Sequence, residues 1–340
     1  MILFDASRIN TGGGKVLLEY FMDRNKERDN IVYLLDNRLN TSLVESGNYK
    51  YLIKNKNSFL PSKIKLILNK KKAKYFSFIN IPSILLALFQ VEQIVYIHNT
   101  YIFKNKSMKF VYIRFLIKLA IFLDKRITFH VQTKTVKDNF QETFNFKNIK
   151  IMPFYDSDKL KKYQILHASN IFIYDFIYLG LPSDHKNHEL LLDALEIIPK
   201  NIVFNIAMTV PKHEDRLLDK INKHNLTSHI TIINLGLLSY NEAMESLAKS
   251  KCLIFPSLLE TYGLPLIEAQ IVGLDILASK LSYVNDVIEP TDTFNPLDKV
   301  DIKDCITQYI LNENNKNSQL KSFNKIEGIE KILFDNKGKQ

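Results

Sequence analysis

The chain has 340 residues, of which 46% are hydrophobic and 24% are charged; this length allows two domains of ordinary size, and this composition excludes an intrinsically disordered chain. Its two cysteines, Cys252 and Cys305, belong to no CxxC pair, which excludes a disulfide framework and favours the reducing cytoplasm. Because Asp5 interrupts the hydrophobic start and every later apolar run is short or charged, we expect neither a signal peptide nor a membrane span.

The formal net charge of +10 is divided unevenly along the chain. Residues 1–165 hold 29 Lys and Arg against 13 Asp and Glu, whereas residues 166–340 hold 17 against 23. The first half therefore has a balance of +16 and the second a balance of −6. This asymmetry indicates that the first half faces an anionic partner, such as a nucleic acid, an anionic membrane or a phosphorylated substrate.

Two segments concentrate the positive charge. Residues 50–74 contain nine lysines and no acid, and residues 109–126 mix apolar residues with lysine and arginine. Two interpretations of the second segment stay open: a basic amphipathic helix that lies on an anionic membrane, and a core-facing helix with a solvated basic face. We expect no nucleic-acid partner, because the lysines accompany no recognisable nucleic-acid-binding motif.

The first half begins with a predicted strand at residues 2–5, a glycine loop at Gly12–Gly14 and a helix from Lys15 to about Asp23. A strand, a glycine loop and a helix in this order open a doubly wound α/β unit. Further strands are predicted at residues 31–35, 75–78, 94–97, 128–131 and 149–152.

The second half repeats the alternation of strands and helices. Strands are predicted at residues 176–179, 203–208, 230–233, 253–255 and 275–278, and helices at 188–198, 215–224, 240–249 and 265–272. This pattern predicts a parallel sheet in each half. The predicted fold class is thus α/β, with an N-terminal Rossmann-like domain at residues 1–160 and a C-terminal one at 161–340, joined through a polar linker near residues 156–170.

The most informative segment is FPSLLETYGLPLIEA at residues 255–269. It predicts a buried strand, a turn and a helix, with Pro265 at the first helical position and Gly263 allowing close approach of a ligand. The helix N-terminus offers free N–H groups to an anion. Glu260 is expected in the turn, and Glu268 in the first helical turn, from which it reaches back toward the same ligand. In a purely structural alternative, Glu268 only interacts favourably with the positive end of the helix dipole, and Glu260 is a solvated turn residue.

This segment resembles the donor-binding signature of the family 4 (group 1) retaining glycosyltransferases, which have the GT-B fold of two Rossmann-like domains and an interdomain cleft. The resemblance extends over the second half through Tyr178-Leu179-Gly180 with Lys186-Asn187, through ASKLSYVNDVI at residues 278–288 and through FNPLD at residues 294–298. It is looser in the first half, where it rests on the Gly12–Gly14 loop, Ile97-His98-Asn99 and Val131-Gln132-Thr133.

The resemblance implies a role for each matching residue in the second half. Glu268 would hold the ribose hydroxyls of a nucleotide sugar, and Glu260 would lie near the sugar and its leaving phosphate. Lys186 would neutralise the departing diphosphate, which stabilises charge in the transition state. Lys186 would be assisted by the backbone N–H groups of Tyr262, Gly263 and Leu264.

In the first half, the resemblance implies that Gly13 and Gly14 approach the diphosphate from the other domain. His98, directly after a predicted strand, would contact the sugar. His130 is the competing histidine.

One departure concerns the phosphate site. Members of the family usually carry an arginine directly after the glycine that stands here as Gly180, whereas this chain has Leu181 and Pro182. Lys186 is then the obvious cation, and the alternatives for a second one stay open among Arg8, Lys15 and His185.

Metal use is not expected. Asp156-Ser157-Asp158 resembles the metal-binding DxD of the other glycosyltransferase fold, but it falls in the predicted linker, where Asp and Ser are common turn residues. The histidines show no metal-ligand spacing.

The sequence thus predicts a glycosyltransferase that needs no cofactor and uses a nucleoside diphosphate sugar as substrate. The resemblance implies transfer with retention to a saccharide acceptor, which we expect to be lipid-linked, in the biosynthesis of a bacterial surface polysaccharide such as O-antigen, capsule or lipopolysaccharide. We expect a cytoplasmic enzyme, peripheral on the inner face of the membrane if the basic half docks there. The alternatives are a nucleotide-sugar epimerase of the same fold and a non-catalytic scaffold subunit, which the missing arginine would favour.

Overall fold

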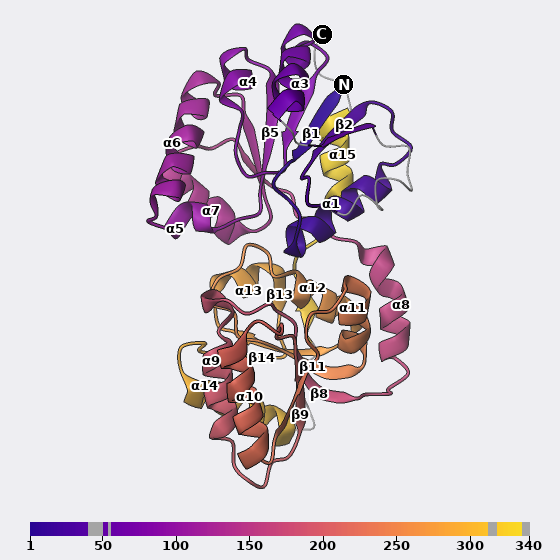
Figure 1. Cartoon of the computed structure of the whole chain (residues 1–340), viewed down its shortest axis with the longest axis vertical. Helices are drawn as coiled ribbons and strands as arrows, with labels where there is room; N and C mark the ends of the chain where they lie inside the picture. Colours follow the sequence, from indigo (N-terminus) through magenta and orange to yellow (C-terminus); the bar gives the residue numbers. More distant parts are fainter. Residues whose placement is uncertain (40–49, 54–55, 312–317, 335–340) are drawn as a thin grey trace. The chain divides into compact units, whose positions relative to one another are not determined.

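The computed structural model describes residues 1–39, 50–53, 56–311 and 318–334. The chain divides into two compact units (Figure 1). The first unit comprises Met1–Asp156 together with Phe323–Gln340, and the second comprises Ser157–Ser322. Each unit is built on one parallel sheet flanked by helices.

The sheet of the first unit has seven strands within the described residues, in the order β3-β2-β1-β4-β5-β6-β7, and all are parallel. The strands are β1 (Ile2–Ala6), β2 (Ile31–Leu35), β3 (Lys50–Ile53), β4 (Lys74–Ser77), β5 (Glu92–Ile97), β6 (Thr128–Val131) and β7 (Ile149–Ile151). The helices are α1 (Gly12–Arg24), α3 (Lys56–Leu68), α4 (Ile84–Leu88), α5 (Tyr101–Lys104), α6 (Met108–Leu123), α7 (Lys134–Phe144) and α15 (Ile326–Phe334). The strand order reverses between β1 and β4.

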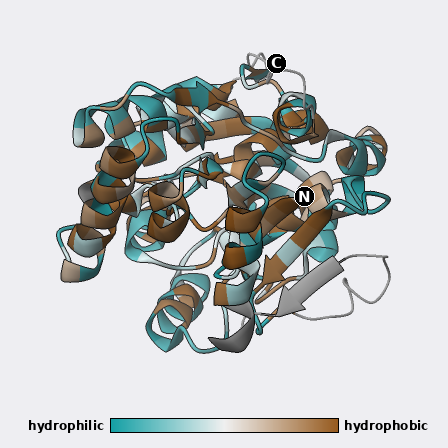
Figure 2. Cartoon of the chain, turned by 90° about the horizontal axis from the view of Figure 1, so that it is seen from above, coloured by the Kyte–Doolittle hydropathy of each residue, from teal (hydrophilic) through white to brown (hydrophobic). Residues whose placement is uncertain are grey.

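Burial explains why these segments form strands. All five residues of β1 are buried, as expected for a central strand covered on both faces. Phe4 of β1 packs its ring 4.6 Å from the ring of Phe21 on α1 and 4.8 Å from that of Phe76 on β4, measured between centroids. The helices instead alternate hydrophobic and hydrophilic residues (Figure 2). The core of this unit therefore lies between the central strands and the apolar faces of the helices.

The C-terminal helix α15 belongs to the first unit, beside α1 (Figure 1). Its apolar face is buried through Ile326, Ile329 and Leu333. Glu330 accepts a hydrogen bond of 2.8 Å from Arg24 Nε on α1. The predicted division placed residues 161–340 together in one domain. The structure instead groups α15 with the first unit, where Arg24 pairs with Glu330 and the Arg28 guanidinium lies 3.8 Å from the centroid of the Phe334 ring.

The sheet of the second unit has six parallel strands within the described residues, in the order β10-β9-β8-β11-β12-β14. They are β8 (Tyr174–Tyr178), β9 (Asn205–Met208), β10 (Thr231–Asn234), β11 (Ser250–Phe255), β12 (Asp275–Ser279) and β14 (Asp292–Phe294), and a small antiparallel pair joins β13 (Ile288–Glu289) to β15 (Gln319–Leu320). The helices are α8 (Ser157–His167), the one-turn 3₁₀ helix η1 (Asp184–Lys186), α9 (His188–Glu196), α10 (Asp215–Thr227), α11 (Tyr240–Ala248), α12 (Leu264–Val272), α13 (Ser282–Val287) and α14 (Lys299–Leu311). The strand order reverses between β8 and β11.

Several elements differ from the prediction, and β14, α13 and α14 were not predicted. The polar stretch predicted as a linker forms the helix α8, because Leu160 and Tyr163, three residues apart, are buried and α8 packs against α11 and α12. The boundary between the units lies at Asp156 and Ser157, ahead of this helix. Strand β3 was not predicted, since its segment stood out by its lysines rather than by an apolar pattern.

None of the helices in the described part of the chain combines the length and the apolar character needed to cross a membrane.

Candidate functional site

An ion pair lies at the carboxyl edge of the second sheet, where the strand order reverses. Lys186 ends η1 in the segment after β8, and Glu260 lies in the loop after β11. Lys186 Nζ is 2.5 Å from Glu260 Oε1, and the two side chains are only 17% and 15% exposed. Ligands of open α/β sheets bind outside the carboxyl ends of the strands at such a reversal. The structure therefore brings two of the predicted catalytic residues together at the expected edge.

Hydrogen bonds hold both partners of this ion pair in place. Ser257 Oγ donates to Glu260 Oε1 over 2.7 Å, and the Tyr178 hydroxyl donates to the backbone oxygen of Lys186 over 2.6 Å. The residue after Lys186, Asn187, has a positive φ of 61°, which asparagine tolerates better than most residues. Its amide donates to the carbonyl oxygens of Pro256 at 3.2 Å and Pro296 at 2.7 Å. These contacts fix the β8 and β11 loops against each other, so the charged groups need little reorganisation when a ligand binds.

The N-terminus of α12 adjoins the loop that carries Glu260. Gly263 caps the helix with a φ of 71°, a left-handed conformation that favours glycine. Leu264 is the first helical residue and Pro265 the second, one position later than predicted. The side chain of Tyr262 is buried, and its hydroxyl lies 2.8 Å from Ser322 Oγ. What Tyr262, Gly263 and Leu264 offer to an anionic ligand is therefore the N–H end of the helix rather than a side chain.

Glu268 occupies the second turn of α12, and the prediction of a first-turn position was wrong, because the helix begins at Leu264 and holds no acid in its first turn. Its side chain is only 7% exposed. Burial raises the pKa of Glu268 to about 7, although a hydrogen bond with Tyr240 and the charge of Lys159 act in the opposite direction. A buried carboxyl group with a raised pKa costs stability and is typical of functional sites. The dipole-matching alternative does not apply to this position.

In the first unit, the structure brings Gly14 and His98 together. Both Gly13 and Gly14 lie in the first turn of α1, and His98 follows β5 directly. A Cβ atom on Gly14 would lie 3.3 Å from His98 Cε1, so glycine is what lets the helix approach the ring this closely. The backbone N–H of His98 donates to Asn80 Oδ1 over 2.6 Å, which fixes the residue.

Two neighbours meet the Nε2 atom of the His98 ring. It lies 2.8 Å from the carbonyl oxygen of Phe78, which can only accept a hydrogen bond, and 3.3 Å from the amide nitrogen of Asn80, which can only donate one. These contacts hold the ring in position. Burial lowers the pKa of His98, which keeps the ring neutral near pH 7.

The competing histidine, His130, lies in β6 and is fully buried. Burial lowers its pKa to about 3. Within the described residues, neither ring nitrogen has a hydrogen-bond partner. Its environment is thus that of the sheet core, whereas His98 lies just beyond the end of β5.

The candidates for a second phosphate cation differ in their surroundings. His185 is neutral near pH 7, because burial and the charge of Lys186 lower its pKa. Lys15 pairs with Glu19 on α1 at 3.5 Å, and Arg8 is exposed beyond β1. These two residues belong to the first unit.

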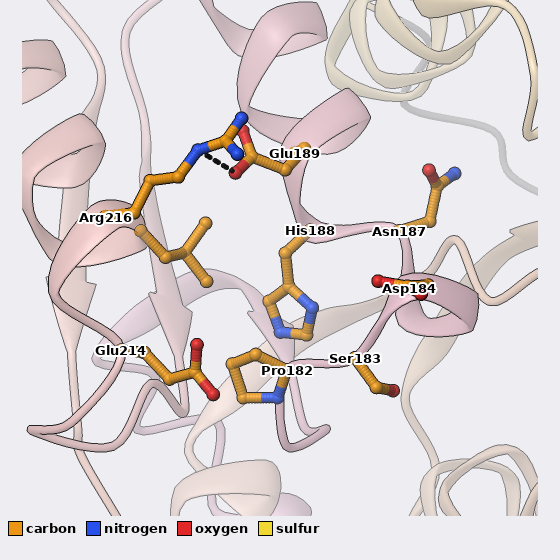
Figure 3. Close-up of a pocket in the computed structure, with 9 residues that line it drawn as sticks. Pro182, Ser183, Asp184, Asn187, His188, Glu189, Glu214 and Arg216 are labelled. Atoms are coloured by element: carbon orange, nitrogen blue, oxygen red, sulfur yellow. Dashed lines mark ion pairs between the residues drawn. The ribbon is translucent and has the colours of Figure 1, made fainter.

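A cavity of about 370 Å³ lies beside the segment that replaces the expected arginine. It is lined by Pro182, Ser183 and Asp184 from this segment and by residues at the start of α9 and α10. There Arg216 Nε faces Glu189 at 3.5 Å (Figure 3). Arg216 was missed by the sequence analysis, because it stands in no motif. Its side chain is 91% exposed and already paired, so it is a weak replacement for the arginine.

The Asp156-Ser157-Asp158 triplet spans the start of α8, which begins at Ser157, and Asp158 pairs there with Lys161 at 2.7 Å. Across the described part of the chain, no group of three or more His, Cys, Asp or Glu side chains is arranged as a metal site.

The amino-acid sequence of this region matches a known family of enzymes. The family model of the glycosyl transferases group 1 matches residues 142–326, more than half of the chain. The chain belongs to this family. The match contains the Lys186–Glu260 pair and the whole of α12, so the site described above lies in the part of the chain that defines the family. The predicted family is confirmed at this level.

Curated relatives share parts of the sequence. The serotype-specific mannosyltransferase WbdA of Escherichia coli is 28% identical over 141 residues, which cover 40% of this chain and 17% of the relative. The O-antigen chain mannosyltransferase RfbU of Salmonella typhimurium is 24% identical over 200 residues, which cover 58% of this chain and 54% of the relative. The chain thus spans about half or less of the curated relatives that it matches.

Solved structures share the fold over nearly the whole chain. The Anabaena protein Alr3699/HepE, solved with UDP and glucose, aligns with a TM-score of 0.66 at 14% identity and covers 98% of this chain and 95% of its own. The lipopolysaccharide glycosyltransferase WaaG aligns with a TM-score of 0.58 at 12% identity and covers 92% of both chains. The predicted α/β fold class of GT-B type, with two Rossmann-like domains, is confirmed.

Proposed function

We propose that this protein transfers a sugar from a nucleoside diphosphate sugar to a saccharide acceptor. The observation that carries the proposal is the Lys186–Glu260 ion pair at the strand reversal of the second sheet, next to the N-terminus of α12. The match to the glycosyl transferases group 1 over the same residues supports it. The second unit would bind the donor, and the first unit would bind the acceptor.

The chemistry follows from where charge develops. When the bond between the sugar and the diphosphate breaks, negative charge grows on the leaving phosphate oxygen. The ammonium group of Lys186 and the N–H end of α12 stabilise this charge. Glu260 holds the ammonium group in position before the donor arrives and then lies near the sugar. The proposal includes retention at the anomeric carbon, which rests on the resemblance of the 255–269 segment to the retaining family.

Glu268 would bind the ribose. A carboxylate accepts hydrogen bonds from both ribose hydroxyls, and the buried position of Glu268 strengthens such bonds. Ionisation of this group is needed for the role, and the nearby Lys159 and Tyr240 favour it. With Lys186 and a helix terminus neutralising the diphosphate, we propose that the reaction uses neither a metal ion nor a cofactor.

We further propose a place in the biosynthesis of a bacterial surface polysaccharide, at the inner face of the cell membrane. The relative RfbU is named for the O-antigen chain, which supports this place. Both WbdA and RfbU are named mannosyltransferases, which supports a hexose as the transferred sugar. The basic balance of the first half supports an acceptor that is anionic or attached to an anionic surface.

A panel of nucleoside diphosphate sugars, screened by thermal shift, tests the donor. A ligand at 100 times its dissociation constant should add about 2.7 kcal/mol to the free energy of unfolding. The donor that binds is then incubated with saccharide acceptors, and release of the nucleoside diphosphate is followed. Absence of both binding and turnover would support a non-catalytic scaffold instead, and conversion of the donor alone to a sugar isomer would support an epimerase.

A further inference from the structure

A cavity of about 580 Å³ lies in the first unit, at the point where its strand order reverses. Arg8, two residues beyond β1, and Ile79, two residues beyond β4, both line it. This is the corresponding position to that of the Lys186–Glu260 pair in the second unit, outside the carboxyl ends of the strands at a reversal. Sites at this position in open α/β sheets commonly bind ligands.

The wall of this cavity is mainly apolar. It is built from the segment after β4 and from three helices, α3, α4 and α6, through side chains that include Leu60, Ile81, Ile84, Leu85, Ile113 and Leu116. Such a wall suits a hydrocarbon chain rather than a free sugar, whose hydroxyl groups would lose their hydrogen bonds to water.

Three basic side chains interrupt the apolar wall: Arg8, Lys63 and Lys109. No acidic residue lines the cavity among the described residues. The nearby Asp5 is engaged by the Tyr75 hydroxyl at 2.5 Å and by the Ser7 backbone N–H at 3.1 Å. The charge of the wall itself is thus positive, which suits an anionic group.

Lys63 is the least exposed of the three, at 7%. Its ammonium nitrogen lies 5.4 Å from the centroid of the Tyr75 ring. Burial and the charge of Arg8 lower the pKa of Lys63, and the charge of Asp5 acts in the opposite direction. Because the two basic groups are close enough to affect each other, a phosphate bound in the cavity could interact with both through charge-assisted hydrogen bonds.

The surface around the cavity is apolar as well. Helix α6 buries Ile113, Ile117 and Ala120, as a core-facing helix does, but its opposite face exposes Met108, Val111, Tyr112 and Phe115. The predicted alternative of a core-facing helix with a solvated basic face is therefore incomplete for α6, because this face also carries large apolar side chains. Tyr112, which is 62% exposed, also lines the cavity. An exposed apolar face with interspersed lysines is typical of a helix that touches a membrane surface.

We propose that this cavity binds the phosphate-bearing end of a membrane lipid that carries the acceptor sugar. The phosphate pairs with Arg8, Lys63 and Lys109, and the hydrocarbon chain lies against the apolar wall and leaves over the exposed face of α6. This inference rests on the proposed function, since it names the chemical class of the acceptor.

Calorimetric titration of the full chain tests the site with three probes: dodecyl phosphate below its micellar concentration, dodecanol and inorganic phosphate. Dodecyl phosphate should bind at least about tenfold more tightly than either other probe, because only it offers both a hydrocarbon chain and a charge. Lys63→Met, which keeps the apolar stem, and Lys109→Ala should each weaken its binding by about tenfold.

Lys118→Ala is the matched control, because Lys118 is exposed on the same helix as Lys109 but does not line the cavity. This variant should bind dodecyl phosphate as the unmodified protein does. Equal losses in Lys118→Ala and Lys109→Ala would overturn the site in favour of a general basic surface. If inorganic phosphate bound as tightly as dodecyl phosphate, the proposal that the ligand is a lipid would be rejected.

Nucleoside diphosphate binding, measured on the same samples, separates the two proposals. Normal nucleotide binding together with no preference for dodecyl phosphate would reject the lipid site alone. The expected variant pattern with dodecyl phosphate, but without binding or turnover of any nucleotide sugar, would support the lipid site and reject the proposed function.

Discussion

The two units of this protein use the same edge of the same kind of sheet in different ways. At the strand reversal of the second unit, a lysine and a glutamate pair at 2.5 Å and leave a polar site beside a helix N-terminus. At the reversal of the first unit, three basic side chains surround an apolar cavity. The first arrangement suits a hydrophilic diphosphate and the second an amphiphile. The same sheet topology thus provides a binding position at the strand reversal of each unit, and the side chains at that position determine which class of ligand fits.

The two sites also differ in the side chains that their walls present. In the second unit, Asn187, Ser257 and Tyr178 tie the two loops together by hydrogen bonds. In the first unit, the cavity wall is made of helices that carry exposed apolar residues, such as Leu60 on α3 and Tyr112 on α6. A hydrogen-bonded polar site is suited to stabilising charge, whereas apolar contacts are suited to a hydrocarbon chain.

The largest expected effect comes from removing the cation of the second unit. Lys186→Ala should lower kcat by about 10²–10³, because one lost electrostatic stabiliser has this magnitude. Binding of the nucleotide sugar should weaken less, since the charge grows only as the bond breaks. Lys212→Ala, an exposed lysine in the same unit, is the control. A near-normal kcat for Lys186→Ala would instead indicate that Arg8 or Lys15 is the cation that stabilises the leaving diphosphate.

The assignment of α15 to the first unit is tested by Ile329→Ala. Ile329 is fully buried, and removing such a side chain costs about 2–5 kcal/mol. The exposed Lys331→Ala on the same helix should change stability by less than about 0.5 kcal/mol. A bound nucleoside diphosphate should stabilise the second unit, so in calorimetry it identifies the unfolding transition of that unit. If Ile329→Ala lowered the stability in this transition alone, the assignment of α15 to the first unit would be contradicted.

The pKa of Glu268 predicts a pH dependence of stability. A rise from 4.5 to about 7 means that the folded state holds a proton that the unfolded state releases. The contribution of the protonated group is complete below pH 4.5 and is lost as the pH rises through 7, by on the order of 3 kcal/mol. Glu268→Gln should therefore become more stable than the unmodified protein as the pH rises from 5 to 8, as measured by urea unfolding.

Two further measurements sharpen this test. Glu245→Gln, on the exposed side of α11, should keep the pH profile of the unmodified protein. Binding of a nucleotide sugar should tighten as Glu268 ionises, because the carboxylate accepts the ribose hydroxyls, and Glu268→Ala should weaken this binding. Parallel stability profiles for Glu268→Gln and the unmodified protein would reject the raised pKa, and unchanged affinity in Glu268→Ala would reject the ribose contact.

Most strands and the second-unit site were predictable because their signals are local. Buried parallel strands appear as short apolar runs, and residues 255–269 carry Glu260, Gly263 and Glu268 within one strand, turn and helix. The exact turn occupied by Glu268 was not predictable, since it depends on the helix starting at Leu264. Helix α8 was hidden by its polar composition, because only two buried side chains mark its apolar face.

The cavity of the first unit could not be predicted from the sequence. Its basic residues, Arg8, Lys63 and Lys109, are separated by more than 40 residues each and lie among many other lysines. The sequence therefore showed an excess of charge but not which charges share a pocket. That information arises only when α3 and α6 pack around the ends of β1 and β4.

The smallest expected effect concerns the contact between Gly14 and His98. An added Cβ would lie 3.3 Å from His98 Cε1 and 3.5 Å from Ile9 Cγ2, so the ring must move by a few tenths of an ångström. Alanine is favoured over glycine within a helix by about 0.5–1 kcal/mol, which offsets the tighter packing. Gly14→Ala should therefore change stability by less than about 1 kcal/mol but lower kcat several-fold, as the histidine leaves its position.

A double-mutant cycle decides whether Gly14 acts through His98. If it does, Gly14→Ala should cost nothing further in a His98→Ala background, because the ring that it displaces is gone, and the coupling should be about 0.5–3 kcal/mol. The Cε1–H resonance of His98 should also shift in Gly14→Ala, since the new methyl group lies against that atom. An undiminished loss of kcat in the double mutant would instead show that the methyl group obstructs the ligand directly, as expected if the glycines of α1 approach the diphosphate themselves.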